Sequence, residues 1–115
     1  MFRTLILTLI LLAAAAAPAA AQFETASILG TITDPSGGVI DGAMVSLTNV
    51  DTGVTQVRTS DAAGGHEFVT LRIGTYVLTA EKVGFALTVA DNIRLTVGDR
   101  LRVNLSLPVG APTIF

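Results

Sequence analysis

The stretch Thr75–Lys82, which reads TYVLTAEK, decides the fold class of this chain. A β-strand places alternate side chains on opposite faces, so a period of two predicts a strand with one buried face. Here the positions predicted to face inward are Tyr76, Leu78 and Ala80, and those between them are Val77, Thr79 and Glu81.

The same period recurs on both sides of this stretch, with turn residues about every 8 to 12 positions. The first predicted strand ends at Asp34-Pro35-Ser36-Gly37, a sequence typical of a type I turn. No helix of useful length is indicated after the N-terminal segment. The sequence therefore predicts an all-β sandwich with strands at Ala26–Thr33, Ala43–Val50, Val54–Thr59, around Phe68, at Thr75–Lys82, up to Val97, and at Leu101–Leu107.

The strand Val54–Thr59 has the weakest apolar face of the set. Gln56 and Arg58 fall on one side, and Val57 lies between two threonines on the other. We therefore predict that it is an edge strand.

The last two strands predict a hairpin. Leu95 and Val97 should share a face with Leu101, and a three-residue loop, Gly98–Arg100, would pair Val97 with Leu101. The outward side chains of this hairpin would form one polar face: Arg94, Thr96, Arg102 and Asn104.

The N-terminal residues 1–21 are typical of a secretory signal peptide. Arg3 precedes the apolar run Leu5–Leu12, and Ala19–Ala21 is a small-residue cleavage site before Gln22. A membrane anchor is the competing interpretation, but the apolar stretch is short and no charged flank follows it. We expect a signal peptide at 1–21, a β-sandwich domain at 22–107 and a linker at 108–115.

Composition excludes several classes of protein. The 115 residues include no Cys and one His, and seven Lys or Arg stand against nine Asp or Glu. Without Cys there is no disulfide, zinc finger or thiol nucleophile. Without a basic excess, nucleic-acid binding is not expected.

The candidate catalytic residues do not form a recognisable site. Ser60, Asp61 and His66 supply the residue types of a hydrolytic triad, but no nucleophile elbow accompanies them. His66 and Glu67 are adjacent in a strand and point to opposite faces, so they cannot chelate one metal ion. We expect His66 to fill the core or its rim, and we assign no catalytic, metal-binding or cofactor-binding residue.

Two weaker binding hypotheses concern calcium and sugars. Aspartates in turns at one end of a sandwich can bind calcium, and the candidates are Asp34, Asp41, Asp51, Asp61, Asp91 and Asp99. Turn aspartates are also common for hydrogen-bonding reasons alone. Sugar stacking needs exposed aromatic rings, whereas Phe68, Tyr76 and Phe85 are predicted to lie in the core.

Four segments carry a family resemblance: Gly30–Gly37 (GTITDPSG), Asp41–Val45 (DGAMV), the spaced set Phe68, Leu71, Gly74 and Tyr76, and Gly84-Phe85. Together they resemble the carboxypeptidase regulatory-like domain over about Ala26 to Leu107. The resemblance implies a seven-stranded, transthyretin-like or carbohydrate-binding-like Greek-key sandwich. Such domains commonly stand at the exported N-terminus of bacterial TonB-dependent outer-membrane receptors. His66, Ala63 and Ile73 depart from the family's usual Tyr, Asn and Pro.

The resemblance and the residue inventory leave two functions open. The first is a noncatalytic accessory or interaction module, the N-terminal domain or a fragment of a TonB-dependent receptor, in the periplasm or outer membrane of a Gram-negative bacterium. The alternative is a carbohydrate-binding domain of the envelope. The expected partners are an envelope protein or downstream receptor domains, with a glycan as a further candidate. Membrane contact is expected only through the signal peptide or a barrel outside this chain.

Overall fold

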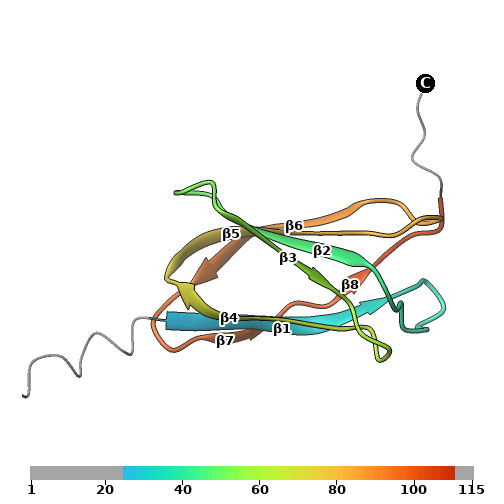
Figure 1. The fold of residues 1–115 in the computed structure, drawn as a ribbon, viewed down its shortest axis with the longest axis horizontal. Coiled ribbons are helices and arrows are strands. Elements are labelled where there is room, and N and C mark those ends of the chain that lie inside the picture. Colours follow the sequence, from blue (N-terminus) through green and yellow to red (C-terminus); the bar gives the residue numbers. More distant parts are fainter. Residues whose placement is uncertain (1–24, 111–115) are drawn as a thin grey trace, which may run out of the picture.

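The computed structural model describes residues 25–110, which form two β-sheets packed face to face (Figure 1). The predicted all-β sandwich is therefore confirmed. The strands are β1 (Thr25–Thr33), β2 (Met44–Asn49), β3 (Thr55–Thr59), β4 (Gly65–Arg72), β5 (Gly74–Glu81), β6 (Thr88–Leu95), β7 (Arg100–Arg102) and β8 (Leu105–Ser106).

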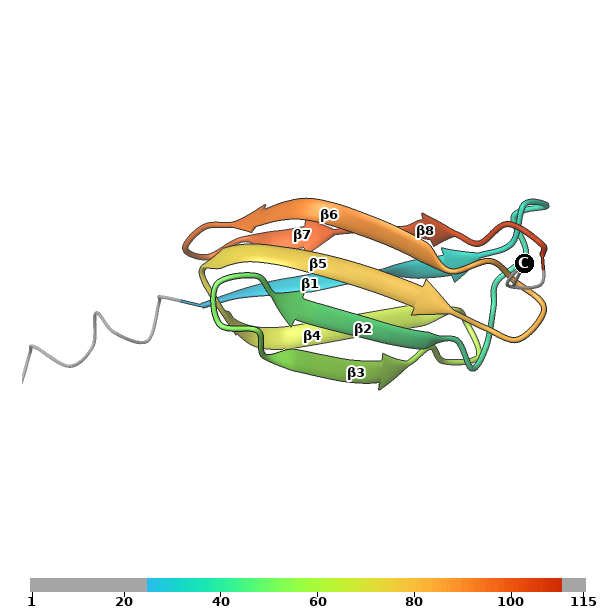
Figure 2. The same ribbon diagram turned by 90° about the horizontal axis from the view of Figure 1, so that it is seen from above.

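One sheet has the order β3-β2-β5-β6, and the other has the order β4-β1-β7, with β8 also pairing with β1. Strands distant in sequence are thus neighbours, as connections that cross between two sheets require. β2 and β5 pair without a register shift, which places Val45 opposite Ala80 and Leu47 opposite Leu78. Figure 2 shows β3 and β6 at the two borders of their sheet.

The core lies between the inward faces of the two sheets. The predicted inward set of β5 is confirmed, because Tyr76 is 4% exposed and Leu78 and Ala80 are fully buried. The largest fully buried side chains come from both sheets: Phe68, Ile28, Ile32, Leu47, Leu71, Leu78, Leu107 and Val45.

The predicted hairpin between the last two strands is wrong. β6 pairs with β5, whereas β7 pairs in parallel with β1 in the other sheet, with Leu101 beside Ile28. The chain changes sheet at a turn in which the Asp99 carboxylate accepts hydrogen bonds from the Thr96 amide and hydroxyl, both at 2.8 Å. Val97 and Leu101 consequently remain 53% and 38% exposed instead of pairing.

The predicted polar face of that hairpin is also wrong, for the same reason. Arg94 belongs to β6 and Arg102 to β7, so the two side chains are carried by different sheets. Asn104 follows β7 and bonds to β1, because its Oδ1 accepts a hydrogen bond from the Thr31 amide at 2.9 Å.

The last predicted strand is divided into β7 and β8, both paired with β1. At the division, the Val103 amide donates to the Leu29 carbonyl at 2.8 Å. Gly30 makes this close approach possible, since a Cβ there would overlap the Val103 carbonyl oxygen. Gly30 is therefore required by the backbone of the neighbouring segment.

The segment after β8, where the predicted linker begins, is still paired with the sandwich up to Gly110. The Ala86 amide donates to the Pro108 carbonyl at 2.7 Å, and the Gly110 amide donates to the Gly84 carbonyl at 3.2 Å. The predicted signal peptide and the end of the predicted linker lie outside the described residues. Within residues 25–110, no helix is long and apolar enough to cross a membrane.

Candidate functional site

The Ser60 hydroxyl has a structural role, because both of its hydrogen bonds are to backbone groups. It is buried, donates to the Ile40 carbonyl at 2.7 Å and accepts from the Ala43 amide at 2.8 Å, so it anchors the entry to β2. Asp61 has a separate task, because its Oδ1 accepts from the Ala63 and Gly65 amides at 2.9 and 2.8 Å. These bonds hold the β3–β4 turn.

His66 lies in the core, as predicted. Its Nε2 lies 3.0 Å from the Val103 carbonyl oxygen, and its ring centroid lies 6.1 Å from that of Phe68. Because a carbonyl only accepts, Nε2 carries the proton and Nδ1 is the acceptor, and Nδ1 is buried without a partner. Burial lowers the pKa of His66, and the bond to Val103 opposes that shift only in part. His66 therefore connects β4 to the β7–β8 junction as a neutral ring.

Three of the candidate aspartates, Asp34, Asp61 and Asp99, accept hydrogen bonds from backbone amides, whereas Asp91 lies within β6 and not in a turn. In Asp34, Oδ1 accepts from the Ser36 hydroxyl and from the Ser36 and Gly38 amides at 2.6, 2.9 and 2.9 Å. The hydroxyl bond from Ser36 is the main cause of its lowered pKa. The pKa of Asp99 is lowered chiefly by the bond from the Thr96 amide. Asp34 and Asp61 belong to turns at one end of the sandwich, and Asp99 belongs to a turn at the other.

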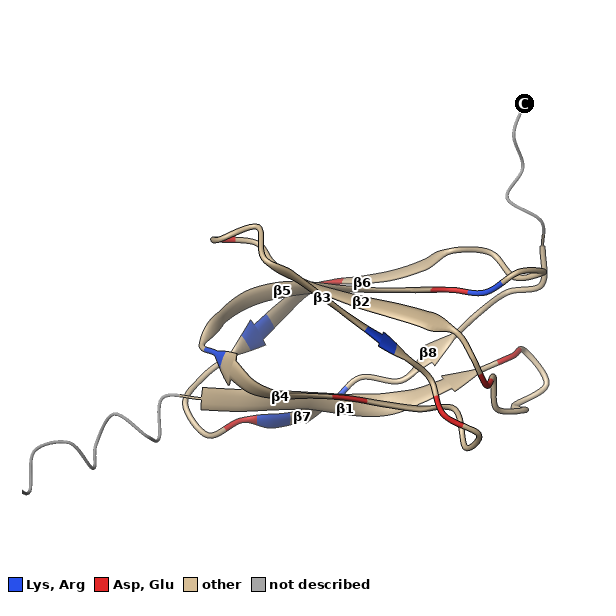
Figure 3. Cartoon of the chain, in the orientation of Figure 1, with Lys and Arg blue, Asp and Glu red and all other residues tan. Residues whose placement is uncertain are grey.

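No group of three or more His, Asp or Glu that could hold a metal ion occurs within residues 25–110. Charged residues are spread over both sheets and their loops, and neither sign dominates the described part of the chain (Figure 3). Within residues 25–110, the carboxylates therefore do not form the cluster that the calcium hypothesis requires.

A shallow groove of about 760 Å³ lies where β5 runs into the loop before β6. It was not predicted from the sequence, although Val83-Gly84, an apolar residue next to a turn glycine, is the signal that could have indicated it. We call this the β5–β6 groove, and its lining residues are Gly42, Met44, Glu81, Lys82, Val83, Gly84, Phe85 and Leu87.

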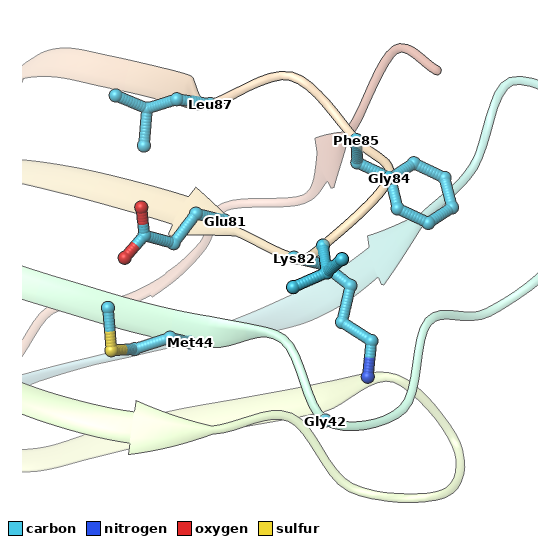
Figure 4. Close-up of a pocket in the computed structure, with 8 residues that line it drawn as sticks. Gly42, Met44, Glu81, Lys82, Gly84, Phe85 and Leu87 are labelled. Carbon is cyan, nitrogen blue, oxygen red and sulfur yellow. The ribbon is translucent and has the colours of Figure 1, made fainter. Parts of the chain in front are cut away.

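Phe85 is the only aromatic residue among those described that is not buried. Its prediction as a core residue holds in part, because it is half-buried and packs against the core. Figure 4 shows its ring turned away from Met44, Glu81 and Leu87. Lys82 is also occupied, since its Nζ donates to the Asp41 carbonyl at 2.9 Å. The groove therefore lacks an aromatic platform for sugar stacking.

A second hollow, of about 280 Å³, lies between β3 and β4. Tyr76 contributes to its lining, but the hydroxyl of Tyr76 donates to the Arg72 carbonyl at 2.7 Å. The lining also includes Thr70, which adopts a φ of 55° at a bulge in β4. This hollow therefore lies at the border between the two sheets, and residues of both sheets line it.

β3 is an edge strand, as predicted. It pairs with β2 on one side, from Thr48 opposite Thr55 to Met44 opposite Thr59, without a register shift. Its other side pairs with no strand of the described chain. Val57, at its centre, is 50% exposed.

Comparisons with known proteins address the family and the fold. The family model described as carboxypeptidase regulatory-like domain matches residues 27–108. A search of curated proteins finds no match.

Solved structures share the fold at low identity. The Bacillus anthracis TIE protein is 21% identical with a TM-score of 0.64, over 75% of this chain and 17% of that one. Catechol 1,2-dioxygenase from Acinetobacter radioresistens is 11% identical with a TM-score of 0.64, over 84% of this chain and 56% of that one. A Bacteroides uniformis protein described as carbohydrate-binding is 19% identical with a TM-score of 0.57, over 71% of this chain and 40% of that one. The chain thus spans from about one sixth to just over half of these proteins.

Proposed function

The chain belongs to the carboxypeptidase regulatory-like domain family, and from this premise we propose that it is a noncatalytic interaction module of a bacterial envelope. In this proposal the chain is exported after cleavage before Gln22. It serves as the N-terminal domain of a TonB-dependent outer-membrane receptor, and it acts by contact with another protein or with a downstream domain of the receptor.

One observation carries the proposal: the polar groups that could perform chemistry are engaged within the fold, while a regular strand edge remains open. Ser60 and His66 each bond to backbone groups of neighbouring segments. β3 presents exposed backbone along its outer side. An open edge binds a partner strand through main-chain hydrogen bonds and needs no pocket.

Carbohydrate binding is the second candidate function, and the β5–β6 groove is the observation that favours it. The groove combines an apolar wall, Met44 and Leu87, with the polar side chains of Glu81 and Lys82. Against this, the Phe85 ring is turned away (Figure 4).

The decisive experiment is a glycan array probed with the purified protein, combined with zinc and calcium titrations followed by calorimetry. The interaction-module proposal expects no saturable signal in either. Micromolar sugar binding that is lost in a Leu87→Ala variant but kept in a Val69→Ala variant would establish the carbohydrate function instead. Val69 is the matched control for Leu87, because both side chains are exposed and only Leu87 lines the groove.

The receptor part of the proposal has its own test, which is the reading frame that follows Phe115 in the source genome. Plug and barrel sequence downstream would support a receptor. An unrelated downstream domain would refute it while leaving the interaction module in place.

A further inference from the structure

The edges of the two sheets are not alike. β4 has a bulge at Thr70, and β6 has one at Asn92, where φ is 53°. The edge formed by β7 and β8 is divided between the two short strands. Bulges and short strands are the usual means by which proteins protect sheet edges from pairing with other chains. Among the edges that the structure describes, β3 alone keeps regular pairing along its whole length.

The hydrogen bonds to β2 determine which groups of β3 face outward. The Asn49 amide donates to the Val54 carbonyl, and the Ser60 amide donates to the Ala43 carbonyl, both at 2.9 Å. Since backbone direction alternates along an antiparallel strand, every second residue from Val54 to Ser60 faces β2. The N–H and C=O groups of Thr55, Val57 and Thr59 therefore point to solvent.

The sequence of β3, TQVRT, is symmetric in character about Val57. If a second β3 approaches in the antiparallel direction, Val57 lies opposite Val57, and Thr55 lies opposite Thr59. The inward residues then place Gln56 opposite Arg58. Val–Val and Thr–Thr pairs are favourable across strands, and no like charges stand directly opposite.

The side chains of Gln56 and Arg58 already form, within one chain, the amide–guanidinium contact that this pairing would place between two chains. The Arg58 Nη2 lies 3.5 Å from the Gln56 Oε1. The same guanidinium lies over the Phe68 ring of β4, 5.3 Å from its centroid.

Arg58 also modulates access to the edge. Its Nη1 donates to the Val57 carbonyl at 2.9 Å, which is the acceptor that a partner strand would use. A partner must therefore displace this bond, and an inward charge on an edge strand weakens pairing. The association expected is weak and depends on concentration.

We propose that the occupant of the β3 edge is a second copy of this chain, paired antiparallel with Val57 opposite Val57. The β3-β2-β5-β6 sheet of one copy then joins the same sheet of the second copy in one continuous sheet across a two-fold axis. This is an isologous contact, in which both copies use the same surface. This inference rests on the proposed role in protein contact, and it names the partner.

Sedimentation equilibrium of the protein purified from expression of the full chain tests association between about 10 µM and about 1 mM, the range of weak interfaces. We expect a reversible dimer. Val57→Lys should weaken it about 5-fold or more, because two ammonium groups would stand opposite each other. Val89→Lys is the matched control on the other edge strand of the sheet, since Val89 is 53% exposed against 50% for Val57. It should leave the dimer unchanged.

The register has an independent test, because the chain contains no cysteine. Directly opposite residues in a hydrogen-bonded pair have Cα atoms about 5.5 Å apart, which suits a disulfide. Val57→Cys should therefore give a disulfide-linked dimer under mild oxidation. Thr59→Cys should not, because its two copies would lie about 14 Å apart along the strands.

A protein that stays monomeric throughout, with no cross-link at Val57, overturns the inference and leaves the edge to a strand of another protein. Equal weakening by Val57→Lys and Val89→Lys, or equal cross-linking at Val57 and Thr59, overturns the proposed surface. None of these results changes the glycan-array outcome, so failure of this inference is distinguishable from failure of the proposed function.

Discussion

Replacement of Gly30 by Ala tests the packing of the β7–β8 junction against β1. Gly30 lies inside a strand and has no left-handed φ. At such a position Ala ordinarily stabilises a protein by about 0.5–1 kcal/mol, because Gly loses more backbone entropy on folding. We predict the opposite sign here.

The magnitude follows from what the added methyl group meets. It would overlap the Val103 carbonyl oxygen and lie 2.9 Å from the His66 Nε2. The obstacle is backbone, held to β1 by the bond from the Val103 amide to the Leu29 carbonyl, so the β7–β8 segment must shift as a unit. Overpacking of this kind costs about 1–3 kcal/mol. Loss of the part-buried His66–Val103 bond adds about 1–3 kcal/mol, so we expect a destabilisation of about 2–6 kcal/mol.

Urea unfolding followed by circular dichroism measures this free energy, with Gly110→Ala as the control. Gly110 also lacks a left-handed φ, and a Cβ there would meet only the Ala86 methyl group at 4.0 Å. The control should unfold within about 0.5 kcal/mol of wild type. A Gly30→Ala variant as stable as wild type, or more stable, would refute the close approach between β1 and Val103.

Three further predictions concern two aromatic residues, the pH dependence of stability and the cleavage of the signal peptide. Tyr76→Ala should lower the free energy of unfolding by about 3–5 kcal/mol and Phe85→Ala by about 1–2 kcal/mol, because Tyr76 is buried and Phe85 only half-buried. Equal losses for the two variants in denaturant melts would contradict this difference. His66 has a lowered pKa in the fold, so the unfolded chain binds its proton first, and stability should fall as the pH drops below the ordinary value of 6.5. Melts at about pH 7 and pH 5 should show this loss in wild type and a smaller one in His66→Phe. Mass spectrometry of the exported protein should give an N-terminus at Gln22, and recovery of the uncleaved chain from the inner membrane would count against a signal peptide.

The elements predicted well from the sequence are those in which alternation has a single interpretation. Within Thr75–Lys82 the inward set is Tyr76, Leu78 and Ala80, and all three are buried. The edge position of Val54–Thr59 was predicted in the same way, because Gln56 and Arg58 cannot form a core face. The alternation of apolar and polar residues indicates which face of a strand is buried, so it predicts correctly where the face is the only question.

The hairpin prediction failed because alternation does not say which sheet a strand joins. In a sandwich both sheets face one core, so Leu95 of β6 and Leu105 of β8 are buried from opposite sides. Two strands with matched apolar faces therefore look like a hairpin whether or not they pair. Two local signals did point elsewhere. Asp99 stands three residues after Thr96, where its carboxylate closes a turn, and Gly30 marks a close backbone approach inside a strand.

The candidate interaction surface was predictable as an edge, but its contrast with the other edges was not. The bulges in β4 and β6 place Thr70 and Asn92 at φ values of 55° and 53°, and neither is a glycine that would announce this conformation. Asn tolerates this conformation, whereas a β-branched residue such as Thr70 is held there at a cost of about 1–3 kcal/mol. The fold thus interrupts β4 and β6 with bulges, with backbone strain at Thr70, while β3 remains regular. At β3 the protection is limited to the inward charge of Arg58, and its regular pairing, in contrast to the bulged β4 and β6, is the physical reason to assign the contact to that strand.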